Sequence, residues 1–270
     1  MTSSLTDRSA LSAHRARASA DALFLHARAA DDLEDRLALV NRRFTRAAVV
    51  TGQPEFWAAR MPGAHVTEDA QTLDLAEGEH DLVVHALALH WADDPVGQIV
   101  QCRRALAPDG LFVGMLLGGE TLAGLRAALA EAEAAISGGA SPRVAPMADL
   151  RDWGALLARA GFALPVADSD TVRVTYADML ALMRDLRAMG EGNALAARHR
   201  RTPPRALFPA AAAGYAARHP TGGGRVEALF EIVTLTGWAP HPDQPAPLRP
   251  GSATARLSEA LGTRETKVRG

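Results

Sequence analysis

Two short apolar runs with an amphipathic segment between them form the clearest pattern in the chain. Residues 81–91 and 111–117 are almost continuously apolar, which is typical of strands buried on both faces. Asp94 before Pro95 predicts a helix start, and apolar residues follow at helical spacing. The stretch 108–110 predicts a turn that ends this helix. Strand, helix and strand in this order predict a βαβ unit with two adjacent parallel strands.

The chain before this unit predicts a sheet with a short first half. Residues 5–41 predict helix, 47–52 predict the first strand, and 55–60 predict a short helix. The stretch 61–81 has room for one strand and a loop only. We therefore expect one strand or helix of an ordinary α/β half to be missing or compressed.

The chain after the unit alternates between helical and strand patterns. Helices are predicted over 120–135, 147–160, 178–189 and 206–219, and strands over 162–176 and 226–238. We expect three regions: an N-terminal helical segment (1–44), a main α/β domain (45–238) with a helical insertion at about 177–220, and a Pro-rich C-terminal tail (239–270).

Composition excludes several classes of function. A hydrophobic share of 48% allows a full core, and a net charge of −2 gives no reason to expect a nucleic-acid partner. No apolar run approaches the length of a membrane span. Cys102 is the single cysteine, and the nine histidines form no ligand motif, so we expect no metal site.

Five short motifs carry a resemblance to a known family. They are His90-Trp91, Gly118-Gly119-Glu120-Thr121-Leu122, Gly138-Gly139-x-Ser141-Pro142, Arg159-Ala160-Gly161-Phe162 and Met189-Gly190-Glu191-Gly192-Asn193. In this order they resemble the S-adenosylmethionine (SAM) methyltransferase superfamily, in particular the complex I assembly factors of that fold known as arginine hydroxylases. Malonyl carrier-protein methyltransferases are a more distant likeness. The resemblance covers about residues 5–261 and is poor over 47–75.

This resemblance implies a Rossmann-like class I methyltransferase fold, a three-layer α/β/α sandwich with a mostly parallel sheet, truncated in its first half. It also implies a cofactor site at the carboxyl ends of the strands, lined by Thr51, Gly52, Gln53, Asp69, His90 and Trp91. Asp69 matches the acid that meets the adenine at the end of the third strand. Alternatively, it ends a remnant of the second strand, with Glu68 as the ribose acid.

The loop after the first strand departs from the family pattern. It retains one glycine, Gly52, where several normally let the backbone approach the cofactor, and Pro54 follows closely. We therefore expect SAM to bind weakly or not at all.

The second part of the site is expected to contact a substrate or partner. The residues are Gly118, Gly119, Glu120, Glu191 and Asn193. Glu120 either holds a guanidinium or caps the following helix, and His90-Trp91 either lines a pocket or plugs the strand end. We expect both parts of the site to converge on one pocket.

Three functions remain open from the sequence: a SAM-dependent methyltransferase, a complex I assembly factor acting on an arginine of a partner subunit, and a non-catalytic binding protein. The resemblance implies a protein partner, either a respiratory complex I subunit or another protein. Lys267 is the only lysine, and this arginine-rich usage suggests a bacterial source. We expect a cytoplasmic location in a bacterium and the mitochondrial matrix in a eukaryote.

Overall fold

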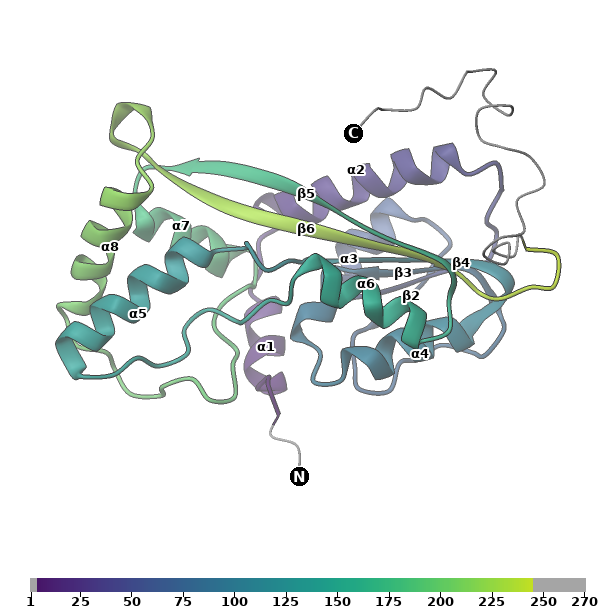
Figure 1. Cartoon of the computed structure of the whole chain (residues 1–270), viewed down its shortest axis with the longest axis horizontal. Helices are drawn as coiled ribbons and strands as arrows, with labels where there is room; N and C mark the ends of the chain where they lie inside the picture. Colours follow the sequence, from purple (N-terminus) through teal and green to yellow (C-terminus); the bar gives the residue numbers. More distant parts are fainter. Residues whose placement is uncertain (1–3, 245–270) are drawn as a thin grey trace, which may run out of the picture. The chain divides into compact units, whose positions relative to one another are not determined.

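A six-stranded sheet forms the centre of the computed structural model, which describes residues 4–244 (Figure 1). The strands are β1 (Ala47–Thr51), β2 (His65–Glu68), β3 (His80–Ala86), β4 (Leu106–Leu117), β5 (Ala163–Tyr176) and β6 (Val226–Trp238), in the order β2-β1-β3-β4-β6-β5. The first four strands of this order are parallel, and β6 is antiparallel to both β4 and β5. The mostly parallel sheet of the expected fold is confirmed.

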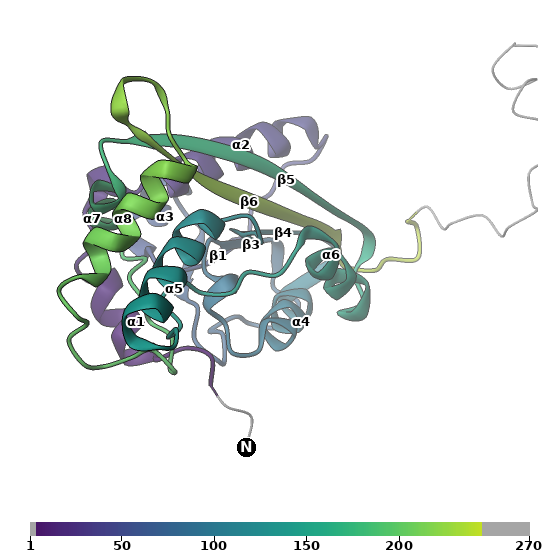
Figure 2. The ribbon, with the colours of Figure 1, turned by 60° about the vertical axis from the view of Figure 1, so that its left-hand side comes forward.

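Eight α-helices accompany the sheet in the described residues. They are α1 (Arg8–Arg15), α2 (Phe24–Leu39), α3 (Pro54–Arg60), α4 (Pro95–Ala105), α5 (Ala123–Ser137), α6 (Leu150–Arg159), α7 (Met179–Ala188) and α8 (Leu207–Arg218). Helices α2 and α4 lie on opposite faces of the sheet, with α6 beside α4 (Figures 1 and 2). Adjacent residues of β3 pack on opposite faces of the sheet. Val84 packs in the core beneath α2, and Val83 packs in the core with Ile99 of α4. These are the expected three layers. No helix among residues 4–244 is long and apolar enough to cross a membrane.

The central βαβ unit is confirmed. Strands β3 and β4 are adjacent and parallel. The expected core residues Val83, Val84, Leu87, Phe112 and Val113 are all buried. Near-continuous burial explains why the apolar pattern was so clear, since a parallel strand at the sheet centre has no solvent-facing side.

Two local expectations were wrong. The stretch 108–110 does not end the helix with a turn, because β4 begins at Leu106 and contains a bulge there. Asp109 takes the left-handed conformation with φ 61°, which an Asp tolerates better than most residues. The N-terminal segment is not one helix: it breaks after Arg15, passes through a short 3₁₀ turn over Ala20–Ala22, and resumes at Phe24.

The first half of the sheet is short, as expected. Strand β2 pairs directly with β1, from Ala48 with His65 to Thr51 with Glu68. It therefore takes the position of the second strand in the common 3-2-1-4-5 order, and the described chain places no strand beyond it. Asp69 follows this strand, so the structure favours the second-strand alternative.

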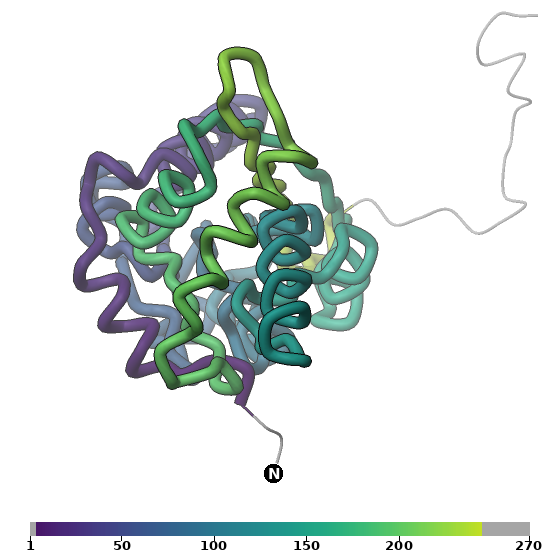
Figure 3. Tube along the Cα trace, turned by 90° about the vertical axis from the view of Figure 1, so that its left-hand side faces the viewer, coloured from purple at the N-terminus to yellow at the C-terminus, as the bar shows by residue number. Residues whose placement is uncertain are grey.

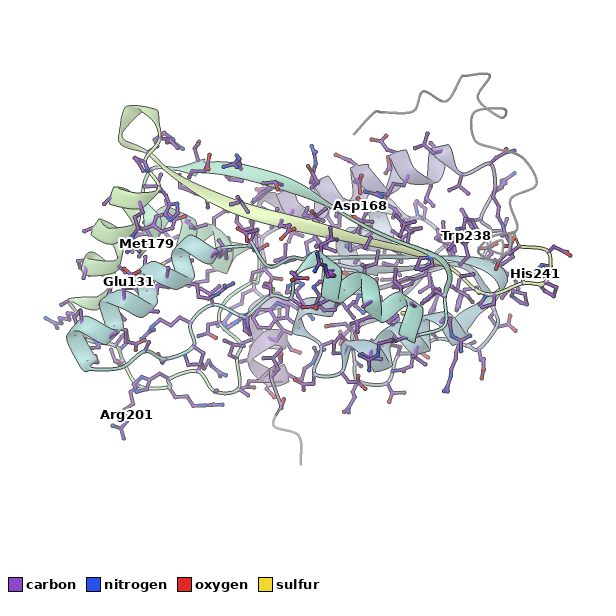
Figure 4. The ribbon with its side chains drawn as sticks, viewed as in Figure 1. Glu131, Asp168, Met179, Arg201, Trp238 and His241 are labelled. Atoms are coloured by element: carbon purple, nitrogen blue, oxygen red, sulfur yellow. The ribbon has the colours of Figure 1, made fainter. Side chains whose placement is uncertain are left out.

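A long antiparallel hairpin reaches past the end of the parallel strands. Residues 232–238 of β6 pair with β4, while the residues before them pair with β5 alone among the described strands. Helices α5, α7 and α8 gather at this end of the hairpin (Figures 1 and 2). Figure 4 labels Met179, at the start of α7 in this region, and Trp238, at the opposite end of β6. The helices and the hairpin share one apolar core with the sheet.

Candidate functional site

The N-terminal segment closes over the carboxyl ends of the first strands. Asp7 accepts a hydrogen bond from the backbone N–H of Ala10 and so caps α1, and Arg198 donates a second bond at 2.8 Å. These hydrogen bonds, that of Arg198 foremost, lower the pKa of Asp7 to about 2. Upstream, the backbone N–H of Thr6 donates to Asp93, in the loop after β3. Helix α1 is thereby held at the site by polar contacts at its start.

Two arginines of α1 form ion pairs with Asp69. Arg15 Nη1 lies 2.5 Å from Asp69 Oδ1, and Arg8 Nη1 lies 3.1 Å from Oδ2. The side chain of Asp69 is 1% exposed and that of Arg15 is 11% exposed. Burial alone raises the pKa of Asp69, but the charge of Arg15 and the hydrogen bonds from both arginines outweigh it and lower the pKa. Asp69 is therefore an ionised, buried carboxylate that binds guanidinium groups.

The same Arg15 covers the loop after β1. A Cβ atom on Gly52 would lie 2.2 Å from Arg15 Cζ, so only a glycine lets the guanidinium lie against the backbone here. Thr51 Oγ1 accepts a hydrogen bond from the backbone N–H of Gln53, which tightens the loop. Gly52 and Asp69, two of the residues expected to hold the cofactor, thus contact the protein's own Arg15.

Glu191 forms the second buried acidic centre. Trp91 donates from Nε1 to Glu191 Oε2 at 2.7 Å, and His90 Nε2 lies 3.4 Å from the same oxygen. Burial raises the pKa of Glu191, but His90, the charge of Arg15 and the Trp91 hydrogen bond outweigh it and lower the pKa to about 2. Both aromatic residues follow β3 in a 3₁₀ turn over Leu89–Trp91, and both are buried.

Glycines shape the loop that carries Glu191. Gly190 has φ 83°, and a Cβ there would lie 3.1 Å from the Cα of Arg15. A Cβ on Gly192 would lie 2.9 Å from Nδ1 of His14. The loop after α7 therefore closes directly against α1, and it brings Glu191 near enough for the charge of Arg15 to lower its pKa.

Several buried polar atoms in this region have no hydrogen-bond partner among the described residues. They are Arg15 Nη2, His14 Nδ1, His85 Nδ1 and His90 Nδ1. His85 lies inside β3, where Gln98 contacts its Nε2 at 2.8 Å and burial lowers its pKa to about 4. Unsatisfied groups of this kind are costly in an interior and are concentrated at functional sites.

Sequence reasoning missed the arginines of α1 and His85 as site residues. Arg8 and Arg15 reach a carboxylate 61 and 54 positions away, and no local pattern marks such a pairing. His85 was visible as a lone histidine within an apolar strand, a signal that equally suits a core residue.

A cavity of about 760 Å³ lies next to Glu191. Trp91, Glu191 and Asn193 form part of its wall, together with mostly apolar side chains from α5, α7 and the hairpin. Figure 3 looks onto this end of the molecule, where α1, α5, α7 and α8 lie together. Among the expected site residues, those around Asp69 belong to the α1 contact and not to this cavity. The structure therefore divides the expected single pocket between two neighbouring places.

The glycines after β4 belong to a turn between Leu117 and Leu122, two residues that line the cavity, but are not lining residues themselves. The backbone N–H groups of Gly118 and Glu120 donate to the carbonyl and to Oε2 of Glu231 in β6, respectively. A Cβ on Gly118 would lie 2.6 Å from Glu231 Oε2, so the absence of a side chain leaves space for this carboxylate. Gly119 follows in the same turn. Glu120 is exposed and does not cap α5, because the helix begins later with Leu122 at the N-cap. Of the two alternatives for Glu120, capping of the helix was therefore wrong.

The fit to a metal or to SAM can be judged from these contacts. No group of three or more His, Cys, Asp or Glu side chains among residues 4–244 could hold a metal. SAM would need open space over Gly52, whereas the guanidinium of Arg15 occupies that space and is held there by Asp69. Glu68, the ribose acid of the second-strand alternative, is exposed. The residues as arranged do not fit the cofactor.

Comparison with known proteins gives a consistent family. A model described as a methyltransferase domain matches residues 15–114. The mitochondrial arginine-hydroxylase NDUFAF5 of Danio rerio is 39% identical over 199 residues, which cover 74% of this chain and 62% of the relative. The malonyl-[acyl-carrier protein] O-methyltransferase of Laribacter hongkongensis is 37% identical over 182 residues, covering 67% and 58%. The chain thus spans about three fifths of the length of these relatives.

A solved structure supports the fold. The YcgJ protein from Bacillus subtilis has a TM-score of 0.50 at 10% identity, covering 79% of this chain and 99% of that one. By sequence and fold, the chain belongs to the SAM-dependent methyltransferase-fold superfamily and is a relative of the arginine-hydroxylase NDUFAF5.

Proposed function

We propose that the chain binds an arginine side chain of a partner protein at the place that Arg15 now occupies. The observation that carries this proposal is the guanidinium of Arg15, buried against the ionised carboxylate of Asp69 with the ionised Glu191 close by. A planar guanidinium pairs with carboxylates through several directed hydrogen bonds, which a lysine ammonium does not reproduce. The site is therefore suited in charge and shape to arginine.

An incoming arginine would have to replace Arg15. Its guanidinium would meet Asp69, and Glu191, held by Trp91, would supply the second negative charge. Arg15 Nη2 and His90 Nδ1 are buried there without hydrogen-bond partners among the described residues.

The relative NDUFAF5 is an arginine hydroxylase, which agrees with recognition of an arginine. The resemblance to complex I assembly factors makes a respiratory complex I subunit the first partner to test, with another arginine-bearing protein as the alternative. We propose a location in the cytoplasm of a bacterium, or in the mitochondrial matrix if the source is eukaryotic; the relative NDUFAF5 is mitochondrial.

Peptide titration tests the proposal. Isothermal titration with acetyl-Gly-Arg-Gly-amide should show at least tenfold tighter binding to Arg15→Ala than to the unchanged chain, because the variant vacates the site. The matched lysine peptide should bind Arg15→Ala about tenfold more weakly than the arginine peptide. Adding Asp69→Asn to Arg15→Ala should abolish the gain, and Arg201→Ala, an exposed arginine outside the site, should change nothing. Equal binding of both peptides would refute arginine recognition.

A second candidate is a SAM-dependent methyltransferase, favoured by the family to which the chain belongs. We propose that SAM binds weakly here because the cofactor must break the contact between Arg15 and Asp69. Titration with SAM and with S-adenosylhomocysteine decides between them. A dissociation constant in the low micromolar range would favour the methyltransferase, while absence of binding to either SAM or arginine would favour the non-catalytic alternative.

A further inference from the structure

The cavity beside Glu191 has an apolar interior. Leu117, Leu125, Leu129, Met183, Phe208 and Phe230 line it, and they come from β4, α5, α7, α8 and β6. Its volume of about 760 Å³ lies within the range of pockets that hold small organic ligands. An interior of this kind has few partners for polar groups and favours a ligand with an apolar body.

The lining also contains cations without counterions. Arg17, Arg184 and Arg187 belong to it, all three are exposed, and none forms an ion pair with another described residue. Arg143 also contributes, but Glu133 neutralises it at 2.7 Å. Three uncompensated guanidiniums around an apolar interior attract an anionic group.

The acidic residue of the wall does not cancel this attraction. Glu191 is 14% exposed, and its Oε2 is held by Trp91 and His90. The charge of Arg15 further compensates it. Asn193, the neighbouring polar residue of the wall, is neutral. The balance of charge at this cavity is therefore positive.

We propose that this cavity binds an anionic single-chain amphiphile, with the chain among the leucine, methionine and phenylalanine side chains and the carboxylate or phosphate head against Arg17, Arg184 and Arg187. The arginines of this cavity are separate from Asp69, which carries the proposed arginine recognition, and the variants below leave Asp69 and the shared residues Trp91 and Glu191 unchanged. The two proposals can therefore fail independently.

The test compares four ligands with the same ten-carbon chain. Isothermal titration should show saturable one-to-one binding of decanoate and decyl phosphate, with decanol at least tenfold weaker and decyltrimethylammonium weaker still. The comparison of the two anions tells whether a carboxylate or a phosphate is preferred. Binding of the anions should weaken at high salt, because exposed charges are screened.

Two sets of variants locate the site. Arg184→Glu with Arg187→Glu should weaken decanoate binding about tenfold, an effect expected for two exposed charges. The matched control is Arg151→Glu with Arg201→Glu, which reverses two exposed arginines outside the cavity and should leave binding unchanged; Figure 4 labels Arg201. Met183→Trp, which fills the half-buried edge of the cavity, should weaken all four ligands about tenfold while circular dichroism stays unchanged.

Three outcomes would overturn the proposal. They are an absence of saturable decanoate binding to the unchanged chain, equal affinity for decanoate and decanol, and equal effects of the cavity pair and the control pair. Weaker decanoate binding by the cavity pair together with unchanged binding by the control pair would support it.

Discussion

The contact between Arg15 and Asp69 joins α1 to the sheet, so removing one partner should cost stability. Arg15→Ala leaves Asp69 with Arg8 alone, and a carboxylate that is 1% exposed cannot turn to water instead. Removing one partner of a buried ion pair commonly costs about 3–5 kcal/mol. Because Arg8 retains its contact at 3.1 Å, we expect a smaller loss of about 2–3 kcal/mol in the free energy of unfolding.

A double-mutant cycle separates pairing from packing. Asp69→Asn alone should also cost about 2–3 kcal/mol, since it leaves the buried guanidinium of Arg15 without its carboxylate. The double variant should lose less than the sum of the two single variants, with a coupling energy of about 1.5–3 kcal/mol. Urea denaturation followed by tryptophan fluorescence measures all four proteins, and Arg17→Ala, which removes an exposed arginine without an ion pair, is the control. A coupling below about 0.5 kcal/mol would show that Arg15 contributes only packing.

The same pair gives the stability a defined dependence on pH. The pKa of Asp69 in the folded protein is lowered below its ordinary value of 3.8. A carboxylate with a lowered pKa contributes stability that is fully present above its unfolded pKa and is lost as the pH falls toward the folded pKa. The difference in stability between the unchanged chain and Arg15→Ala should therefore be constant above about pH 5 and shrink below pH 4. A difference that grows in acid would contradict this assignment.

Three further substitutions or reactions test other parts of the site and core. Trp91→Phe should lower the free energy of unfolding by about 1–2 kcal/mol, measured by denaturation, because it removes the indole hydrogen bond to Glu191. It should also raise the pKa of Glu191 above about 2, measured by NMR titration, and an unchanged pKa would show that this hydrogen bond is unimportant. Gly190→Ala should lower the free energy of unfolding by about 2 kcal/mol, and the control Gly63→Ala should lower it by about 1 kcal/mol. Both glycines have a positive φ, but of the two only Gly190 faces the α1 backbone, where an added Cβ would lie 3.1 Å from the Cα of Arg15. Cys102 is buried with a raised pKa, so its thiol should react with a disulfide reagent only at the rate of unfolding, and rapid labelling of the native chain would refute this.

The layered fold could be predicted because its signals are local. Continuous apolar runs marked β3 and β4, and Asp178 marked the start of α7, where its side chain does accept from the backbone of Ala181. The bulge at Asp109 could not be foreseen, because Pro and Gly beside an Asp equally favour a turn. The absence of a described strand beyond β2 could be predicted because residues 61–81 are too few for two strands and a helix. This prediction depended on the length of the segment and not on its apolar pattern.

The site was only partly accessible from sequence, since its contacts are long-range. Trp91 and Glu191 are 100 positions apart, and only the resemblance suggested that both belong to the site. The resemblance also suggested Gly118, yet that glycine accommodates the Glu231 carboxylate from the neighbouring strand. The role of Arg15 depends on where α1 packs, and this information is absent from any local pattern.

The short first half of the sheet and the position of α1 have one physical explanation. With no strand described beyond β2 and one glycine in the loop after β1, the carboxyl ends of these strands need another cover, and α1 supplies it. Leu11 is the only residue of α1 that is fully buried, so ion pairs rather than apolar packing hold much of the helix in place. A segment with so little buried apolar surface opens at a lower free energy than the core does. In the proposed exchange, a partner's arginine would replace Arg15 at Asp69 with a group of the same charge and shape. The ion pair at Asp69 would then be restored on binding, and the net cost would be limited to moving α1.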